Sequence, residues 1–313
     1  TDLLYYGCYT VFGVLGGNIF NFFRLRKYIH PENIIFSELH IKRHIKPVLK
    51  VFSFSVVTSI YLQLNTVLLG FLKNALAVGY FAAATKVMQM LLTMSACLGS
   101  VMMPRASHLI AENKEDEFNR LIQKSYDFTL AIALPMTIGL IFCAPSLITA
   151  LCGVKFEHSI LPSQIIAPII LMVAISNVFG IQVLFPKGKI NIVTLCCGIG
   201  AVADLILNLC LIPFFSYIGT SIAYLGAEVA TTVSMYFIGR RYIPIIYFKK
   251  SHLTYALGCV VMAFALYGIS LLQLPTLTTL LVQGCCGVLT YFIILCICKD
   301  EMLIQILSKI KKK

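Results

Sequence analysis

Charged residues are scarce in this sequence. Of its 313 residues, only 12% are Asp, Glu, Lys or Arg, whereas 59% are hydrophobic, and the mean hydropathy is +0.88. A soluble domain of ordinary composition carries about twice that charged share, so the composition excludes one. We therefore expect an all-α integral membrane protein.

Acidic residues are rarer still. The chain has 13 Asp and Glu against 25 Lys and Arg, which gives a formal net charge of +12. Such a balance can indicate a nucleic-acid partner, but these basic residues lie in short loops at the ends of apolar segments. A nucleic-acid surface is the poorer explanation of the charge, and no nucleic-acid partner is expected.

The cysteines show no metal-ligand spacing. Nearly all of the 12 lie within apolar segments, where their default role is that of small apolar side chains, so no metal site is predicted. The sequence also shows neither an acidic metal-binding loop nor a sizeable outer domain, which disfavours a membrane glycosyltransferase or a repeat-unit polymerase. We therefore expect that the protein is not an enzyme and that it has neither catalytic residues nor a cofactor.

Apolar windows of about 20 residues, the length that crosses a bilayer, recur along the chain. Three prolines, Pro135, Pro168 and Pro186, lie within or at the ends of these windows, where the missing backbone hydrogen bond can kink a helix. The windows predict nine membrane-spanning helices, at about 3–23, 51–72, 76–103, 126–151, 161–186, 190–213, 217–239, 252–273 and 276–298.

The basic residues are concentrated in every second loop. Of the 25, all but Lys73, Lys86 and Lys155 fall on one side of the nine-helix topology. The positive-inside rule makes that side cytoplasmic. The prediction is a multi-pass membrane protein with Thr1 outside and Lys313 in the cytoplasm.

The longest polar stretch, 24–50, separates the first helix from the rest and is the expected domain boundary. The expected division is a first helix at 1–23, the basic linker 24–50, a six-helix body at 51–243, and a final helix pair with a basic cytoplasmic tail at 244–313. Because the chain begins with neither Met nor a basic leader, it is expected to be a fragment.

Three ionisable side chains lie deep within predicted helices, at Lys86, Asp204 and Glu228. Such groups are costly in a membrane and usually face protein or a water-filled cavity, so each is a candidate site residue. Helical spacing puts Gln89 on the face of Lys86, and Asn208 on the face of Asp204.

The helix that carries Glu228 has two distinct faces. Ser221, Tyr224 and Thr231 share the polar face with Glu228. The other face is built of small residues, which let helices pack closely, at Gly219, Ala223, Gly226 and Ala230.

The charged residues also have a structural alternative. Lys86 could pair with Asp204 or Glu228 and only fix the register of the helices. This alternative competes with a transport pathway lined by Lys86, and the two can coexist. It applies most strongly to Glu228, because that helix also has a face built for close packing.

The uncharged candidates have alternatives of their own. Asn65, Gln89 and Asn208 could form interhelical hydrogen bonds as readily as they could contact a ligand. Arg105 follows Pro104 at a predicted cytoplasmic helix end, where a long cationic side chain commonly extends to the headgroups.

Six segments carry a family resemblance. They are YLQLNTVLLG (61–70), VGYFAAATKV (78–87), VMMPRAS (101–107), LPMTIGL (134–140), GIQVLFPKGK (180–189) and LNLCLIPFFSYIG (207–219), the last followed by Glu228. In this order they resemble the polysaccharide flippases of the multidrug/oligosaccharidyl-lipid/polysaccharide (MOP) exporter superfamily, over about 50–240. The resemblance implies two six-helix lobes around a central cavity. This chain would hold the last helix of the first lobe, the second lobe and two extra C-terminal helices.

The resemblance also implies a function. The substrate would be an undecaprenyl-diphosphate-linked oligosaccharide repeat unit, moved to the outer leaflet of the bacterial cytoplasmic (inner) membrane by alternating access for O-antigen or capsule biosynthesis. Lys86 would present its charge to the diphosphate or to an acidic sugar, and Arg105 would help to capture the headgroup. Asp204 or Glu228 would exchange a coupling proton or sodium ion. Membrane lipids, a polysaccharide polymerase and glycosyltransferases are the implied partners.

Two positions depart from the family pattern, which often has an acidic residue in place of Asn65 and Asn in place of Asp204. Coupling rules therefore do not transfer directly. Two rival functions stay open: another exporter of the superfamily, for drugs or lipid II, and a non-transporting scaffold of a glycan assembly complex. A drug exporter would be expected to have a more apolar, aromatic cavity than the polar stripe that carries Lys86.

Overall fold

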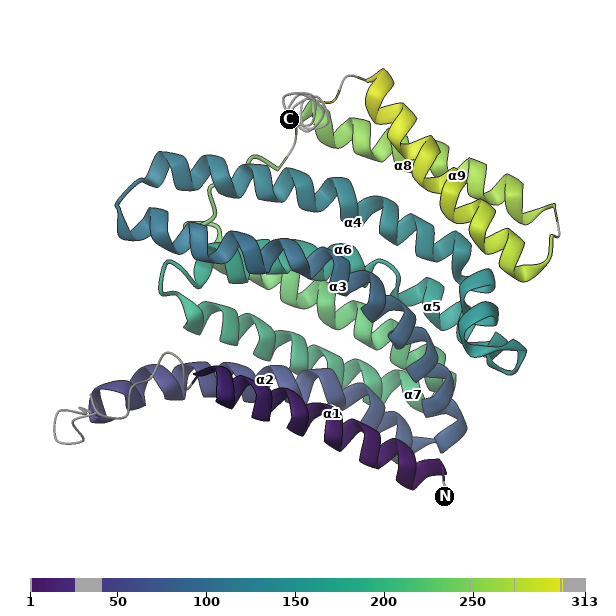
Figure 1. Ribbon diagram of the computed structural model, residues 1–313, viewed down its shortest axis with the longest axis horizontal. Helices are drawn as coiled ribbons and strands as arrows, with labels where there is room; N and C mark the ends of the chain where they lie inside the picture. Colours follow the sequence, from purple (N-terminus) through teal and green to yellow (C-terminus); the bar gives the residue numbers. More distant parts are fainter. Residues whose placement is uncertain (1, 26–40, 248, 273, 299, 301–313) are drawn as a thin grey trace. The chain divides into compact units, whose positions relative to one another are not determined.

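The computed structural model describes residues 2–25, 41–247, 249–272, 274–298 and 300. The elements in these ranges are helices (Figure 1). In chain order they are α1 (Asp2–Leu25), α2 (Ile41–Leu72), α3 (Ala75–Ala111), α4 (Glu115–Cys152), η3 (Val154–Ser159), α5 (Ile160–Ile166), α6 (Ile169–Asn177), η4 (Val178–Leu184), α7 (Ile190–Gly239), α8 (Lys250–Ser270) and α9 (Thr276–Ile297).

Six of the described helices are long and apolar enough to cross a membrane. They lie in α2, α3, α4, α7, α8 and α9, and a bent pair between α4 and α7 raises the number to seven if it forms one span. The predicted all-α, multi-pass membrane fold is confirmed, although the count differs from nine.

The difference from nine arises at three places. The window predicted at 161–186 is a pair of helices bent by 45° around Ala167 and Pro168, so the kink predicted at this proline is confirmed. In α1, only Val11–Leu25 qualifies, as a shorter apolar helix. The windows predicted at 190–213 and 217–239 form the single element α7.

The 50-residue α7 is broken at Ser216, whose φ of 52° and ψ of −130° are not helical. A straight helix of that length would measure about 75 Å, against a hydrocarbon core of about 30 Å. Pro213 precedes the break, and its carbonyl accepts a hydrogen bond from Nζ of Lys73 at 2.9 Å. The broken element supplies two stretches, each long enough to span.

The two halves of α7 lie side by side. Residues further before the break contact residues further after it, as in an antiparallel hairpin. The contacts are those of Gly219 with Leu211, Gly226 with Leu207, and Gly200 with Thr231 and Ala227. A Cβ atom at Gly219 would lie 2.5 Å from the backbone oxygen of Leu211. The small-residue face predicted for the second half is therefore what allows the close approach.

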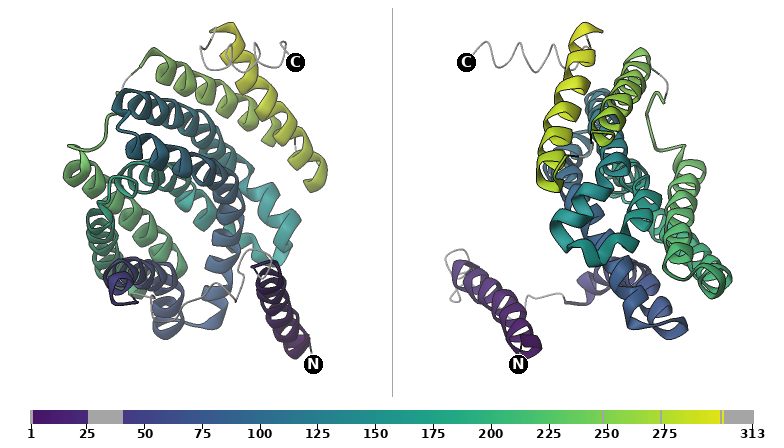
Figure 2. Two further views of the ribbon diagram at one scale, coloured as in Figure 1. Left: turned by 60° about the vertical axis from the view of Figure 1, so that its left-hand side comes forward. Right: turned by 90° about the vertical axis from the view of Figure 1, so that its right-hand side faces the viewer.

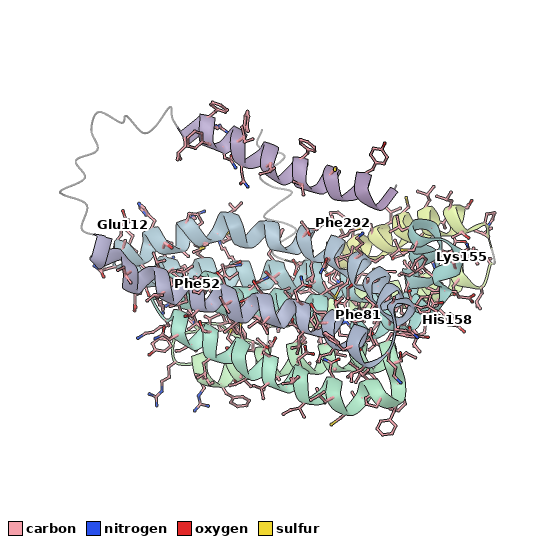
Figure 3. All side chains as sticks on the ribbon, turned by 90° about the horizontal axis from the view of Figure 1, so that it is seen from below. Phe52, Phe81, Glu112, Lys155, His158 and Phe292 are labelled. Carbon is pink, nitrogen blue, oxygen red and sulfur yellow. The ribbon has the colours of Figure 1, made fainter. Side chains whose placement is uncertain are left out.

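The α3–α4 hairpin fixes the two ends of the bundle. Only three residues, including Glu112, separate α3 from α4, and Figure 3 places Glu112 at the end opposite Lys155 and His158. Figure 2 shows α8 and α9 as a second hairpin, which packs on α4. Hydrogen bonds that join α9 to α4 include Tyr291 Oη to the carbonyl of Ala131, at 2.8 Å.

The centre of the bundle is occupied by α6 and η4. Ile169, Ile170, Val178 and Leu184 are fully buried there. The η4 stretch is π-helical, and its Gln182 accepts a hydrogen bond from Ser125 of α4. This buried amide–hydroxyl contact ties the irregular segment to α4.

The chain divides into two compact units, Thr1–Leu49 and Lys50–Lys313. The sites considered below lie in the second unit. The predicted linker 24–50 and basic tail fall largely outside the described residues, at 26–40 and 301–313. Within the linker, α2 already begins at Ile41.

Candidate functional site

Three of the predicted site residues meet in a buried polar cluster. Nδ2 of Asn65 donates to Oδ2 of Asp204 at 3.0 Å. Nδ2 of Asn208 lies 3.0 Å from Oδ1 of Asp204 and 2.9 Å from Oδ1 of Asn65. The three side chains are at most 2% exposed. The cluster therefore joins α2 to the first half of α7 through amide and carboxylate groups.

Helical spacing builds this cluster. Asp204 and Asn208 stand four residues apart, so they share a face of α7 as the sequence predicted. On α2, Asn65 and Leu69 share the buried face by the same spacing, and Leu69 is fully buried. Each helix thus supplies its polar group from a face that packs within the protein.

The cluster leaves one strong acceptor without a donor. Oδ1 of Asn208 is buried and has no hydrogen-bond partner among the residues that the structure describes. A buried polar atom in that state costs free energy, about 1–3 kcal/mol. The oxygen lies on the side chain whose nitrogen contacts Asp204, so oxygen ligands and a carboxylate occupy one small region, which suits a hard cation or a proton.

Glu228 lies in the second half of α7 and is 5% exposed. Its neighbour in sequence, Ala227, faces Gly200 across the hairpin, and so does Thr231 one turn beyond. The hairpin therefore brings the turn that carries Glu228 alongside the turn that leads to Asp204. The buried position of Glu228 within this packed face agrees with both the structural and the functional interpretation.

Lys86 is exposed and lies within the candidate span Ala75–Met94. The ion pairs of the described residues do not include it, so the predicted alternative of a pair with Asp204 or Glu228 is not observed. Gln89, one turn away, is exposed on the same face. An ammonium group at this depth requires water, protein or an anion beside it.

Arg105 is also exposed, five turns beyond Lys86 on the same long helix. Pro104 lies inside α3 and does not end it. The seven predicted site residues thus separate into three groups: the cluster of Asn65 with the two α7 residues, the buried Glu228, and the exposed cations and amide of α3.

The sequence did not indicate an apolar pocket of about 430 Å³ between α3, α4, α8 and α9. Its lining includes Pro135 and Met136 of α4, Met262 of α8 and Gly284 of α9. Gln283, fully enclosed beside it, accepts a hydrogen bond from Ser146 at 3.0 Å. The signal in the sequence was the pair Gly284 and Gly287, three residues apart, which leaves one face of α9 open.

A second network missed from the sequence centres on Asp127. Its Oδ1 lies 3.0 Å from Nε2 of His252 and 2.7 Å from Nε2 of Gln123, and its Oδ2 lies 2.9 Å from Nζ of Lys249. The Gln123 amide also binds both backbone polar groups of Ile246. This network fastens α8 and the segment before it to α4, so we assign it a structural role.

Comparisons with known proteins agree with the fold. Residues 15–161 match the family described as "Polysaccharide biosynthesis protein". Two curated relatives carry the name "Putative O-antigen transporter": one from Escherichia coli (strain K12), 25% identical over 63% of this chain and 47% of its own length, and one from Shigella dysenteriae, 26% identical over 71% and 55%. The chain thus spans about half the length of these relatives.

Two solved structures have similar folds. The lipid II flippase MurJ in an inward closed conformation matches with a TM-score of 0.74 at 18% identity, over 93% of this chain and 62% of its own. An outward-facing multidrug resistance MATE family transporter of the MOP superfamily matches with a TM-score of 0.56 at 17% identity, over 71% and 53%. Together with the sequence matches, these confirm the predicted resemblance to polysaccharide flippases, and the two solved structures show the likeness of the fold.

Proposed function

We propose that residues 51–243 form the C-terminal lobe of a flippase that moves undecaprenyl-diphosphate-linked oligosaccharide repeat units across the cytoplasmic membrane for surface polysaccharide synthesis. The observation that carries the proposal is Lys86, an exposed cation that lies within a candidate membrane span and forms no ion pair with another described residue. The names of the curated relatives support the substrate class.

The exposed face of α3 provides the headgroup contacts in this proposal. Lys86 offers a compact charge to the diphosphate or to an acidic sugar, and Gln89 offers an amide one turn away. Arg105 lies about 28 Å further along the helix, from 19 residues at about 1.5 Å each. That separation suits two successive positions of one headgroup as it crosses from leaflet to leaflet.

The buried cluster of Asn65, Asp204 and Asn208 is the proposed coupling site. A carboxylate with amide oxygens around it can take up a proton or a sodium ion, and the unpartnered Oδ1 of Asn208 provides a further oxygen ligand. Uptake would change the hydrogen bonds between α2 and α7. Because these bonds join two membrane-spanning helices, the change would bias the conformation of the lobe.

The apolar pocket beside α8 and α9 is the proposed site for part of the polyprenyl chain. Apart from Gln283, the α9 residues that line it include Gly284, Val288 and Phe292. A lipid-linked substrate needs such a surface while its headgroup crosses the membrane. The same molecule would then contact α3 with its phosphates and α9 with its hydrocarbon.

Complementation tests this function. In a host without its matching flippase, the full-length protein should restore surface polysaccharide, and Lys86→Ala should reduce it at least about tenfold, the loss expected for one charge-assisted contact. Lys86→Arg should retain part of the activity, and Lys250→Ala, an exposed lysine on α8, should behave as wild type. Equal restoration by Lys86→Ala at equal abundance would remove Lys86 from the pathway.

A further inference from the structure

A second site lies at the end of the bundle where α3 ends and α4 begins, the end marked by Glu112 in Figure 3. It is a pocket of about 560 Å³, a volume typical of sites for small ligands. Three cations line it: Lys187 and Lys189 from the turn before α7, and Arg241 from the segment after α7. It contains none of the residues of the proposed transport pathway.

Contacts within the pocket hold its lysines without neutralising them. Nζ of Lys187 donates to the carbonyl of Tyr242 at 3.1 Å and lies 5.0 Å from the ring centroid of Phe118. Nζ of Lys189 lies 5.0 Å from the ring centroid of Tyr242. Both lysines are half-buried. Aromatic faces and a carbonyl orient an ammonium group but leave its full positive charge in place.

The backbone that carries the two lysines is fixed as well. Gly188 between them has φ of 70°, in the left-handed region that glycine adopts most readily. The amide of Lys187 donates to the carbonyl of Val183 at 3.2 Å, and that of Lys189 to Leu184 at 2.8 Å. This glycine turn after the π-helical segment directs both ammonium groups into one pocket, so the site is preorganised.

The charges of the pocket do not balance. Glu115 is the one carboxylate in the lining, against three cations. The ion pairs of the described residues include none of these cations. The nearby Glu112 already contacts Lys114 at 2.9 Å, and the hydrogen bond from that lysine lowers the pKa of the Glu112 carboxyl. Three like charges in one partly buried pocket repel one another unless an anion joins them.

The position of the pocket indicates where that anion comes from. Its walls are the end of α3, the start of α4, and the segments on either side of α7, and the candidate spans of α4 and α7 begin or end there. Spans end at the level of the lipid headgroups, and basic pockets between helices at this depth bind anionic headgroups. We propose that Lys187, Lys189 and Arg241 bind a phosphate-bearing anion, supplied by an acidic phospholipid of the surrounding leaflet.

Lipid binding by the purified full chain in detergent tests the proposal. The probes are phosphatidylglycerol, zwitterionic phosphatidylcholine with the same acyl chains, and inorganic pyrophosphate, with bound ligand measured by native mass spectrometry. Wild type should prefer phosphatidylglycerol. The double variant Lys189→Gln with Arg241→Gln should bind it at least about tenfold more weakly, because two charge-assisted contacts are lost. Lys187 stays in place because it also bonds the Tyr242 carbonyl.

A matched control changes the same number of charges outside the pocket. Arg240→Gln with Lys250→Gln removes two exposed cations and should leave binding unchanged. Glu115→Gln removes the lining carboxylate and should tighten phosphatidylglycerol binding about threefold, within the range of an exposed charge pair. This gain cannot come from misfolding.

The outcomes separate clearly. Pyrophosphate binding that the pocket variant abolishes, with no preference for phosphatidylglycerol, would keep the phosphate site but assign it a soluble ligand. Equal binding of both probes by wild type and the pocket variant would overturn the proposal. So would an equal loss in the control variant, because the effect would then be one of net charge.

Discussion

Asn65 donates from Nδ2 to Oδ2 of Asp204 at 3.0 Å, so the two positions at which the sequence departs from the family pattern are in direct contact. The resemblance implies an acidic residue on α2 and an amide on α7, whereas this chain has the amide on α2 and the acidic residue on α7. Exchange of the two residue types keeps one carboxylate and one amide within the same buried site. We therefore infer that the two departures compensate each other, since the site holds one carboxylate and one amide in either arrangement.

The first prediction follows from this exchange. Asn65→Asp alone would bury two carboxylates in contact, and Asp204→Asn alone would remove the only one in the pair. Each single variant should reduce restoration of surface polysaccharide about tenfold, and the double variant should recover most of it, since contacting residues couple by about 0.5–3 kcal/mol. Polysaccharide per cell, normalised to protein abundance, provides the measurement. A double variant as inactive as the worse single variant would show that the acid is needed on α7 itself.

The second prediction concerns the α7 hairpin. A Cβ at Gly219 would lie 2.5 Å from the backbone oxygen of Leu211, whereas one at Gly226 would meet only the Cδ1 end of Leu207. The backbone of Leu211 cannot move away from the added methyl group without opening the hairpin, whereas the side chain of Leu207 can change its rotamer. Gly219→Ala should therefore cost about 1–3 kcal/mol of stability, as overpacking does. Gly226→Ala should be close to neutral.

Thermal unfolding of the two purified variants in one detergent measures this difference. The pair is internally controlled, because both substitutions add one methyl group to the same half of α7. Equal unfolding temperatures would mean that the halves do not approach as closely as the Gly219–Leu211 contact requires.

The third prediction tests the apolar pocket. A Cβ at Gly284 would meet no heavy atom within 4 Å, so Gly284→Leu can fill the pocket without a clash in the fold. The variant should fold, since leucine favours a helix over glycine by about 0.8 kcal/mol. Transport should fall at least fivefold, about 1 kcal/mol of lost substrate contact. Gly268→Leu on α8 is the control, because Gly268 is exposed, lies outside the pocket and is equally unobstructed. Unchanged transport by Gly284→Leu would exclude this pocket from the path of the hydrocarbon chain.

The helical faces could be read from the sequence because helical spacing depends only on local geometry. The placement of Asp204 with Asn208, the small-residue face at Gly219 and the kink at Pro168 all follow from residues within a few turns of one another. Periodicity does not say which helix lies opposite a given face. The contact of Asp204 with Asn65, 139 residues away, therefore came only from the structure.

Other features lacked any local signal. The break in α7 falls at Ser216, a residue type that seldom adopts positive φ, so the sequence suggested two helices but not a closely packed hairpin. The basic pocket joins Lys187 to the carbonyl of Tyr242, 55 residues later, and the sequence did not indicate that these two segments meet. For Lys86, the sequence predicted the helix face on which it lies. Whether it pairs with Asp204 or Glu228 could not be predicted from the sequence.

The last prediction concerns the network around Asp127, which fastens α8 to α4. The Asp127 carboxylate contacts the side-chain nitrogens of His252, Gln123 and Lys249. The side chains of Asp127 and His252 are only 17% and 10% exposed. Asp127→Ala would remove the acceptor that these three donors share in a largely buried place, so it should cost about 2–3 kcal/mol, whereas Asp127→Asn keeps an acceptor oxygen and should cost less. Asp116→Ala, an exposed acid in the first turn of α4, should cost under about 1 kcal/mol.

Protease sensitivity of the 240–249 segment gives a second measurement: it should rise for Asp127→Ala and stay at the wild-type level for Asp116→Ala. If Asp127→Ala left both stability and protection unchanged, the apolar packing of α8 on α4 would be sufficient to hold the hairpin, and the network would have to serve a purpose other than attachment.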